Sequence, residues 1–264
     1  MIQLEKIQVK FNPDTPLETI ALKAIDLTIP EGQFVTVIGS NGAGKSTLLN
    51  VLSGDIIPQQ GRVLIGDRDV THWQTARRSQ WVARVFQNPL AGSCPDLSVE
   101  ENLALAYRRG KERRLQPALN HRLREMFREK LASLGLGLEK RLRDRMGLLS
   151  GGQRQAVSLL MSTLSSHQIL LLDEHTAALD PKTAAYILQL TQQIVAERNL
   201  TTLMVTHSMG QALELGTRTL MLHEGEIIFD IQDKARSGLK VGDLLDLFQQ
   251  QQQENLADDA LLLG

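Results

Sequence analysis

The sequence predicts an α/β fold with a parallel sheet, and three stretches of the chain support this prediction. Residues 34–38 form an apolar run that leads into a glycine-rich loop and then into the helical pattern of residues 48–52. Residues 169–172 are all apolar, which is typical of a central strand covered on both faces. Residues 201–205 form a further strand-like run. Strands that alternate with helical stretches in this way indicate parallel β–α–β units.

The loop after the first of these strands fits the pattern GxxxxGK[ST]. Its three glycines lack a Cβ, so the backbone N–H groups can turn toward phosphates, and a helix beginning near Gly44 points its positive end at the same place. Lys45 can reach the β- and γ-phosphates, and the Ser46 hydroxyl can hold a magnesium ion. The stretch predicts a nucleoside triphosphate site formed by Gly39, Ser40, Asn41, Gly42, Ala43, Gly44, Lys45, Ser46 and Thr47.

Acidic and imidazole side chains stand where two later strands end. Asp173 and Glu174 follow the apolar run 169–172, where two carboxylates are hard to explain as core. Near a phosphate loop, Asp173 can hold magnesium and Glu174 can polarise a water molecule. His207 follows the run 201–205, and open α/β sheets bind ligands at the carboxyl ends of their strands. A lone histidine is more often structural, yet this position favours a function.

Two further positions carry weaker signals. Ser150 precedes Gly151-Gly152-Gln153 and an apolar-periodic stretch that reaches about Leu164, so it predicts a helix start with open N–H groups, an anion site without a lysine. Phe11 ends the first predicted strand and could stack on an adenine, although an aromatic residue at a strand end is more often part of the core.

Composition limits the classes of protein. A length of 264 residues suits one large domain or two closely packed ones, and a net charge of −1 excludes a globally basic nucleic-acid binder. The single cysteine, Cys94, can form no intrachain disulfide, which fits a reducing compartment. No apolar run approaches the roughly 18 residues that a membrane helix needs. At a membrane, the chain would therefore sit on a partner.

Charge is unevenly distributed along the chain. Residues 108–145 hold 13 Lys or Arg against five Asp or Glu, a local charge of +8. Two interpretations stay open: a solvated helical face, or a region near an anionic phospholipid surface or an acidic partner.

The remaining pattern predicts short elements. Ser98 and Glu101 have the spacing of a capping box, Asp180-Pro181 starts a helix, and Glu224-Gly225 turns a hairpin over 218–230. A polar run over 249–253 is expected to fray. The other predicted strands are 2–9, 25–29, 61–66 and 81–86, and the other predicted helices are 99–109, 117–134 (closed by Gly135 and Gly137) and 240–249.

These stretches together resemble the ATP-binding subunit of an ABC transporter. The loop GSNGAGKST is similar to Walker A, Gln87 in VFQNP to the Q-loop, and LSGGQ to the family signature. ILLLDE is similar to Walker B, TAALD to the D-loop, and His207 in VTHSM to the switch histidine. The resemblance agrees in order and spacing from about residue 1 to residue 230.

The resemblance implies a fold in more detail. It implies a P-loop NTPase of ABC type with a mixed-sheet core, an N-terminal antiparallel β subdomain and an inserted helical subdomain. It divides a single domain, 1–264, into an ATP-binding core at 1–87 and 166–235 and a helical signature subdomain at 88–165. A C-terminal helix and polar tail would occupy 236–264.

The resemblance also implies a role for each motif. Two copies would pair head to tail, with ATP between the phosphate loop of one and the signature of the other. Glu174 would be the general base, His207 would contact the γ-phosphate, and Gln87 would lie at the water. Asp180 would couple the two sites, and Phe11 would stack on adenine in place of the more frequent tyrosine. The implied magnesium ligands are Ser46, Gln87 and Asp173, and the implied nucleotide contacts beyond the phosphate loop are Phe11, Ser150, Gly151, Gly152, Gln153 and Asp180.

Partners and location follow from the same resemblance. ATP-driven closure of a homodimer would move an integral membrane permease whose short helix enters a groove of the helical subdomain, at the cytoplasmic face of the membrane. EHTAALDP and LALAYRRG are similar to a bacterial subfamily whose permeases resemble branched-chain amino-acid importers. Its solute-binding protein is of a type linked to aromatic amino acids. The expected function is import of a small solute such as an amino acid, with ATP and Mg²⁺ as cofactors and without a nucleic-acid partner.

Other functions share part of this pattern. An exporter or a lipoprotein-release ATPase has the same motifs and differs in its permease. A non-transport ABC ATPase acting on DNA or ribosomes usually has two cassettes or a long coiled-coil insertion, whereas GxxxxGK[ST] occurs once here. A GTPase would need a guanine-reading run similar to NKxD, which the sequence lacks.

One residue departs from the family pattern. Where most relatives read Glu-Pro-Thr after Walker B, this chain reads Glu174-His175-Thr176. We expect hydrolysis to survive because the glutamate is present. The histidine is a candidate for tuning its neighbour Glu174.

Overall fold

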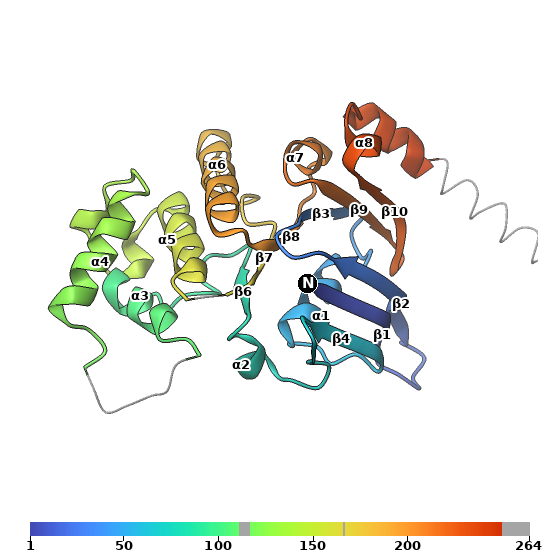
Figure 1. The fold of residues 1–264 in the computed structure, drawn as a ribbon, viewed down its shortest axis with the longest axis horizontal. Helices are drawn as coiled ribbons and strands as arrows, with labels where there is room; N and C mark the ends of the chain where they lie inside the picture. The colour runs from blue at the N-terminus through green and yellow to red at the C-terminus, as the bar shows by residue number, and fades with distance from the viewer. Residues whose placement is uncertain (111–116, 166, 250–264) are drawn as a thin grey trace, which may run out of the picture.

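The computed structural model describes residues 1–110, 117–165 and 167–249, which form two sheets and a group of helices (Figure 1). Within these residues the larger sheet has the strand order β10-β9-β3-β8-β7-β6, and the smaller has the order β2-β1-β4-β5. The strands of the larger sheet are β3 Phe34–Gly39, β6 Val82–Val85, β7 Ile169–Asp173, β8 Thr201–Val205, β9 Arg218–His223 and β10 Glu226–Gln232.

The larger sheet is the mixed sheet that the family resemblance implied. Strand β3 pairs in parallel with β8 and β9, and β7 pairs in parallel with β6 and β8, while β10 is antiparallel at one edge. Side chains of β7 alternate between two cores: Leu170 and Leu172 pack with the helical group, and Ile169 and Leu171 pack on the other face. Both faces are therefore covered, which explains why the strand is apolar throughout.

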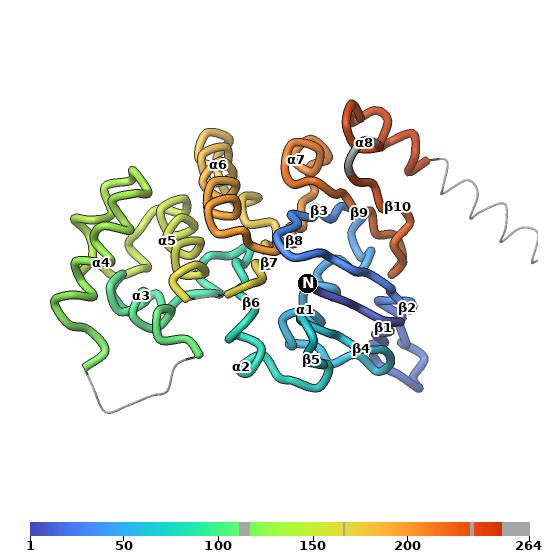
Figure 2. Tube along the Cα trace, in the orientation of Figure 1, coloured from blue at the N-terminus to red at the C-terminus, as the bar shows by residue number. Residues whose placement is uncertain are grey.

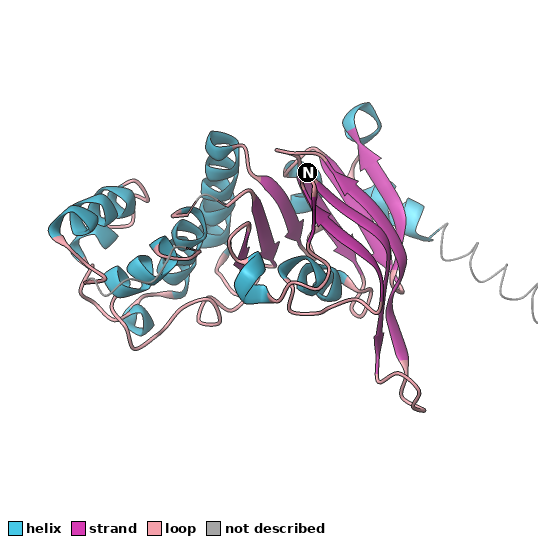
Figure 3. Ribbon diagram, turned by 60° about the horizontal axis from the view of Figure 1, so that its bottom comes forward, coloured by secondary structure: helices cyan, strands magenta, loops and turns pink. Residues whose placement is uncertain are grey.

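The smaller sheet is antiparallel, as expected for the N-terminal part of the chain (Figure 3). Strand β1, Ile2–Phe11, lies between β2, Thr19–Ile29, and β4, Gln60–Ile65, and the short β5, Arg68–Asp69, follows β4. The prediction that the second strand starts at residue 25 was wrong. Lys6 and Ala24 have positive φ, and the register of β1 shifts in this region. Such bulges interrupt the two-residue alternation by which a strand is recognised in sequence.

The helices that lie between strands β6 and β7 in the sequence gather at one end of the molecule (Figures 1 and 2). They are α3 Val99–Tyr107, α4 His121–Ala132 and α5 Gly151–Thr163. The capping box of Ser98 and Glu101 is confirmed at the start of α3. The predicted start of α4 at residue 117 was wrong, because the Asn120 side chain accepts a hydrogen bond from Leu123 N–H and caps the helix there.

Several short elements escaped the sequence analysis: the helices α2 Thr75–Arg78, α7 Met209–Glu214 and α8 Asp233–Arg236, and the 3₁₀ turns η1 Leu138–Lys140 and η2 Met146–Leu148. A helix of four to six residues has too few positions to show a 3.6-residue period. The predicted hairpin and the helix over 240–249 are confirmed, since β9 and β10 flank the turn and residues 241–249 are helical.

Parts of two predictions lie outside the described residues: positions 111–116 of the basic segment, and the polar run after residue 249. In the described part of the chain, no helix combines the length and the apolar character that crossing a bilayer requires.

Candidate nucleotide-binding and hydrolysis site

The phosphate loop leaves strand β3 at Gly39 and enters helix α1, Lys45–Ser53. Gly44 is the N-cap residue of α1, with φ of +100°, and it has no side chain with which to occupy the N–H groups of the first turn. A Cβ on Gly44 would lie 2.5 Å from the carbonyl oxygen of Ala21. The loop therefore requires glycine at this position, and it presents a helix N-terminus suited to an anion.

The β9–β10 hairpin supports this loop, a contact that the sequence analysis missed. Gly225 N–H donates to Ala43 O at 3.1 Å, and Gly225 O accepts from Lys23 N–H at 2.8 Å. Gly225 thus ties the phosphate loop to strand β2. Its turn was predicted, but only the register of the hairpin against β3 brings it to the loop.

Lys45 is buried beneath the loop. Its Nζ donates to the carbonyl oxygens of Gly39 and Ser40, both at 2.8 Å, and the residue is 6% exposed. Burial lowers the pKa of Lys45, while the negative charges of Glu174 and Asp173 act in the opposite direction. The ammonium group is held at the phosphate loop by weak neutral acceptors, which a phosphate oxygen can replace.

Glu174 and His207 meet at the carboxyl ends of the paired strands β7 and β8. His207 Nε2 lies 2.5 Å from Glu174 Oε1, and the two side chains are 51% and 12% exposed. Glu174 has φ of +44°, rare for a residue with a Cβ, and its N–H donates to Val205 O at 3.0 Å. A left-handed conformation at this position aims the carboxylate at the histidine, and strain of this kind is common at functional sites.

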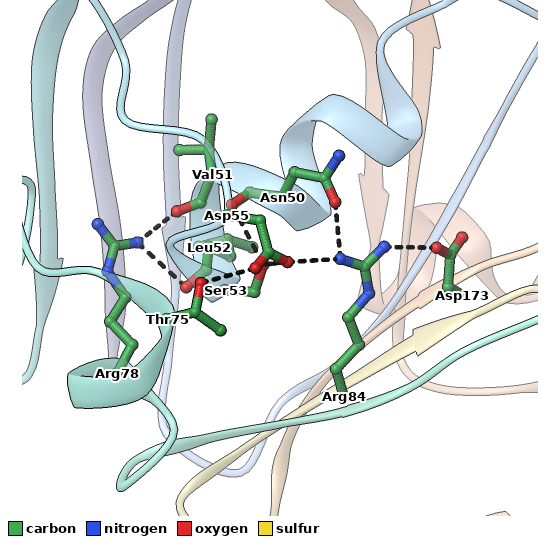
Figure 4. A network of polar contacts seen from close by, with 9 residues as sticks. All are labelled: Asn50, Val51, Leu52, Ser53, Asp55, Thr75, Arg78, Arg84 and Asp173. Carbon is green, nitrogen blue, oxygen red and sulfur yellow. Dashed lines mark hydrogen bonds and ion pairs between the residues drawn. The ribbon is translucent and has the colours of Figure 1, made fainter. Parts of the chain in front are cut away.

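Asp173, at the end of β7, is held by Arg84 of strand β6 (Figure 4). Arg84 Nη2 donates to Asp173 Oδ2 at 2.7 Å, and Nη1 donates to Asn50 Oδ1 at 2.6 Å and to Asp55 Oδ2 at 3.0 Å. The sequence analysis did not single out Arg84. The available signal was an arginine in an otherwise apolar strand, three residues before Gln87.

Gln87 and Phe11 are both exposed. Gln87 follows β6 at the start of the loop that leads to the helices, and Phe11 ends β1 with 42% of its surface exposed. The exposed ring is available for stacking rather than buried in the core. Their roles toward water and adenine stay predictions.

The signature residues form a well-capped helix start. Ser150 Oγ accepts from Gln153 N–H, and Gln153 Oε1 accepts in return from Ser150 N–H, both at 3.2 Å. Arg141 Nη1 also donates to Gln153 Oε1, at 3.0 Å. The predicted N-cap is confirmed, and the capping box with Gln153 adds to it.

The signature and the phosphate loop lie on opposite sides of the larger sheet. Helix α5 packs in one core and α1 in the other, and Figure 1 shows them on either side of β6. The start of α5 lies instead against helix α6, Pro181–Arg198: a Cβ on Gly152 would lie 2.2 Å from Thr183 Cγ2. Asp180 caps that helix through Thr183 N–H at 3.1 Å, so two helix N-termini share one surface.

His175 is buried rather than directed at Glu174. The residue is 2% exposed, and a hydrogen bond joins its Nε2 to Thr191 Oγ1 at 3.0 Å. The Thr191 hydroxyl donates to Ile187 O, so Nε2 must carry the proton of this bond. Burial lowers the pKa of His175 to about 4, which keeps the ring neutral at pH 7.

The buried histidine predicts a pH-dependent stability. An unfolded chain binds a proton at His175 near pH 6.5, whereas the folded chain resists it until about pH 4, so stability falls as pH decreases through this window. At pH 5 the loss is about 2 kcal/mol relative to pH 7.5. We expect His175→Asn to reduce the loss, measured by denaturant unfolding of the nucleotide-free protein at both pH values.

The matched control is His121→Asn, because the His121 side chain is 91% exposed. It should leave the difference between the two pH values unchanged. An equal pH dependence in wild type and His175→Asn would contradict the buried neutral state.

Comparison with known proteins agrees with this site. The family model described as ABC transporter matches residues 22–177. The "Tyrosine transport ATP-binding protein" of Clostridioides difficile is 44% identical over 250 residues, covering 94% of this chain and 99% of the relative. The "Thiamine import ATP-binding protein ThiQ" of Yersinia pseudotuberculosis is 36% identical over 231 residues, covering 87% and 89%.

Solved structures show the same architecture. The dimeric ATP-binding cassette MJ0796 bound to ADP and Pi is 30% identical, with a TM-score of 0.75, covering 88% of this chain and 98% of that one. The ADP conformation of MJ1267 is 23% identical and shows the fold alone, with a TM-score of 0.77 and coverage of 94% and 98%. The chain therefore belongs to the ABC transporter family, and it is an ATPase that forms the ATP-binding subunit of such a transporter.

Proposed function

We propose that the chain drives import of a small solute, such as an amino acid, through a separate membrane permease. The observation that carries this proposal is the 44% identity, over nearly the full length of both chains, to a relative named for tyrosine transport. Relatives named for thiamine import and aliphatic sulfonates import agree with the direction. On this proposal a solute-binding protein delivers the cargo, and the ATPase lies at the cytoplasmic face of the membrane without a nucleic-acid partner.

The proposed chemistry uses the groups at the carboxyl edge of the larger sheet. The phosphate loop and Lys45 bind the phosphates, and Glu174 accepts the proton of the attacking water while His207 holds its carboxylate. Hard oxygen donors are what Mg²⁺ prefers, and Ser46, Gln87 and Asp173 supply them. The ion, when bound, neutralises negative charge on the phosphates.

We also propose that two copies complete each site. The signature start and Asp180 share a surface that lies apart from the phosphate loop of the same chain. A second copy, turned head to tail, can bring that surface to the bound phosphates. The dimeric structure of the 30% identical MJ0796 supports this arrangement.

A groove beside the helical group is the proposed docking site for the permease. It measures about 900 Å³ and includes residues of α2, of the loop after β6, of α3 and of α5. Leu105 of α3 lines it with 55% of its surface exposed, and Phe86 and Met161 add further apolar surface. An apolar helix face from a partner can cover these side chains.

The charge of the groove indicates the chemistry of that partner. Arg108 and Arg109 line the same groove. Burial lowers the pKa of Arg109, so the protein holds a cation where charge is costly. A carboxylate on the docking helix would offset this cost, and we expect the permease to present one.

The proposal predicts which proteins bind the chain in its native cells. Tagged protein, extracted in mild detergent and analysed by mass spectrometry, should recover a multi-span permease. Leu105→Arg should lose it, because a third cation replaces apolar surface in the groove, while binding of ATP stays unchanged. Val241→Arg is the matched control and should retain the permease, because Val241 is 42% exposed, lies in the helical stretch 241–249 and is not among the residues that line the groove.

The co-purified proteins decide between the candidate functions. A solute-binding protein from the same operon establishes import, and its ligand identifies the cargo. Recovery of ribosomes or DNA-repair proteins in place of a permease would overturn the transport proposal.

A further inference from the structure

We propose that Arg84 is a positioning residue of the nucleotide site: it fixes the Asp173 carboxylate and limits how tightly the site binds Mg²⁺ together with ATP. This inference rests on the proposed role of Asp173 on the magnesium side of the site. It concerns a residue outside the motifs by which the family is recognised in sequence.

The guanidinium group of Arg84 joins three elements of the site (Figure 4). From strand β6 it reaches Asp173 at the end of β7 and Asn50 in helix α1, at 2.7 and 2.6 Å. Asn50 stands four residues after Ser46, so both lie on the same face of α1, one turn apart. Arg84 therefore links the helix that carries Ser46 to the carboxylate of Asp173, and both residues are expected magnesium ligands.

The surroundings hold Arg84 in one orientation. Its side chain is 11% exposed, and its guanidinium carbon lies 4.7 Å from the centre of the Phe86 ring. Asp55 accepts from Nη1, and Asp55 is itself fixed by hydroxyl donors, Ser53 at 2.7 Å and Thr75 at 2.6 Å. Arg84 and Ser158 both line a cavity of about 10 Å³, enough for one water, and the Arg84 Nε and the Ser158 hydroxyl are buried.

Two effects on the site follow from this geometry. Nη2 of Arg84 holds Oδ2 of Asp173, so the carboxylate keeps one rotamer and offers its other oxygen to the ligands of the site. The fixed positive charge also makes the site less negative than Asp173 and Glu174 alone would make it, which weakens binding of a cation. Arg84 thus fixes the position of the Asp173 carboxylate and at the same time lowers the affinity of the site for Mg²⁺.

A purely structural role predicts different behaviour. A brace between β6 and α1 would lower stability when removed, and nucleotide binding and turnover would then fall together. A positioning role predicts opposite changes when Arg84 is replaced. Mg²⁺ binding becomes tighter because a positive charge is lost, while turnover falls because the Asp173 carboxylate loses its fixed placement.

The test compares Arg84→Met with Arg84→Lys. Methionine removes both the charge and the hydrogen bonds, whereas lysine keeps the charge but has one nitrogen in place of the two that reach Asp173 and Asn50. The readouts are the Mg²⁺ concentration that half-saturates binding of a fluorescent, non-hydrolysable ATP analogue, the turnover number at saturating Mg-ATP, and the melting temperature without nucleotide. Arg62→Met is the matched control, since Arg62 pairs with Glu5 at the exposed surface of the smaller sheet. It should change none of the three.

We expect Arg84→Met to lower the half-saturating Mg²⁺ concentration by about fivefold. Turnover should fall by roughly tenfold, because a catalytic group loses its fixed geometry. Arg84→Lys should keep the Mg²⁺ dependence of wild type and still lose turnover. Should Arg84→Met fail to fold, a wild-type turnover in Arg84→Lys would by itself overturn the proposal.

Asp173→Asn, measured beside these variants, separates the proposed role of Asp173 in binding Mg²⁺ from the proposed role of Arg84. An unchanged Mg²⁺ dependence in Asp173→Asn would remove the assigned role of Asp173. If Asp173→Asn weakens the Mg²⁺ dependence and Arg84→Met leaves it unchanged, the inference about Arg84 alone is overturned.

Discussion

Replacement of Glu174 by glutamine is expected to lower ATP turnover by about 10²- to 10⁴-fold, the usual contribution of a general base. The amide cannot accept the proton of the attacking water. It has the size of the carboxylate, and its oxygen can still accept from His207 Nε2, so the geometry at the end of β7 is retained. Phosphate release at saturating Mg-ATP measures turnover, and binding of labelled ATP should stay close to wild type.

The same variant reports on the pairing of two chains. Because bound ATP is not consumed, Glu174→Gln should accumulate as an ATP-bound dimer in gel filtration. Adding Ser150→Arg should return it to monomer, since the capped start of α5 would carry a bulky cation in place of a hydroxyl. Glu214→Gln, an exposed acid at the end of α7, is the matched control for turnover. Near-normal turnover in Glu174→Gln would discard the assignment of the base.

The parts of the site that sequence analysis found are set by short stretches of chain. The phosphate loop is recognisable because Gly44 is needed for its backbone conformation and Lys45 follows directly. The placement of Glu174 and His207 at the carboxyl ends of strands was predicted as well, because each directly follows an apolar strand-like run; their direct contact was not predicted. Local chemistry and topology were enough in these cases.

The parts that sequence analysis missed depend on contacts between distant residues. Gly225 reaches the phosphate loop only through the register of β9 against β3, and Arg84 reaches Asp173 across 89 positions of sequence. His175 shows the opposite error. Its place beside Glu174 suggested an interaction, but a peptide chain that turns at Glu174, with φ of +44°, sends the next side chain into the core toward Thr191.

The second large effect concerns Arg78 of helix α2, which is fully buried and caps the end of α1 (Figure 4). Its Nη1 donates to the carbonyl oxygens of Val51 and Leu52 in the last turn of α1, and its Nη2 donates to Val70 O and Thr71 O at 2.6 and 2.8 Å. A cation at this position also complements the negative end of the helix. Burial lowers its pKa to about 10, so the group stays charged at pH 7.

Arg78→Met is expected to lower the free energy of unfolding by about 3–5 kcal/mol, because several buried carbonyl groups lose their donors at once. For a chain of this size, that corresponds to a fall of roughly 10 °C in melting temperature, measured by calorimetry of the nucleotide-free protein. ATP binding should weaken less than stability, since the phosphate loop lies at the other end of α1.

Arg77→Met is the matched control for this prediction. Arg77 precedes Arg78 on the same short helix, but it is exposed and stacks on Trp73 with its guanidinium carbon 3.6 Å from the ring centre. Its loss should cost about 0.5–1 kcal/mol, the usual value of an exposed cation–π contact. The stability of Arg78→Lys should lie between those of Arg77→Met and Arg78→Met, because lysine has one nitrogen to donate to four carbonyl groups. Equal melting temperatures for Arg77→Met and Arg78→Met would show that the carbonyls find other donors and that α1 does not depend on this cap.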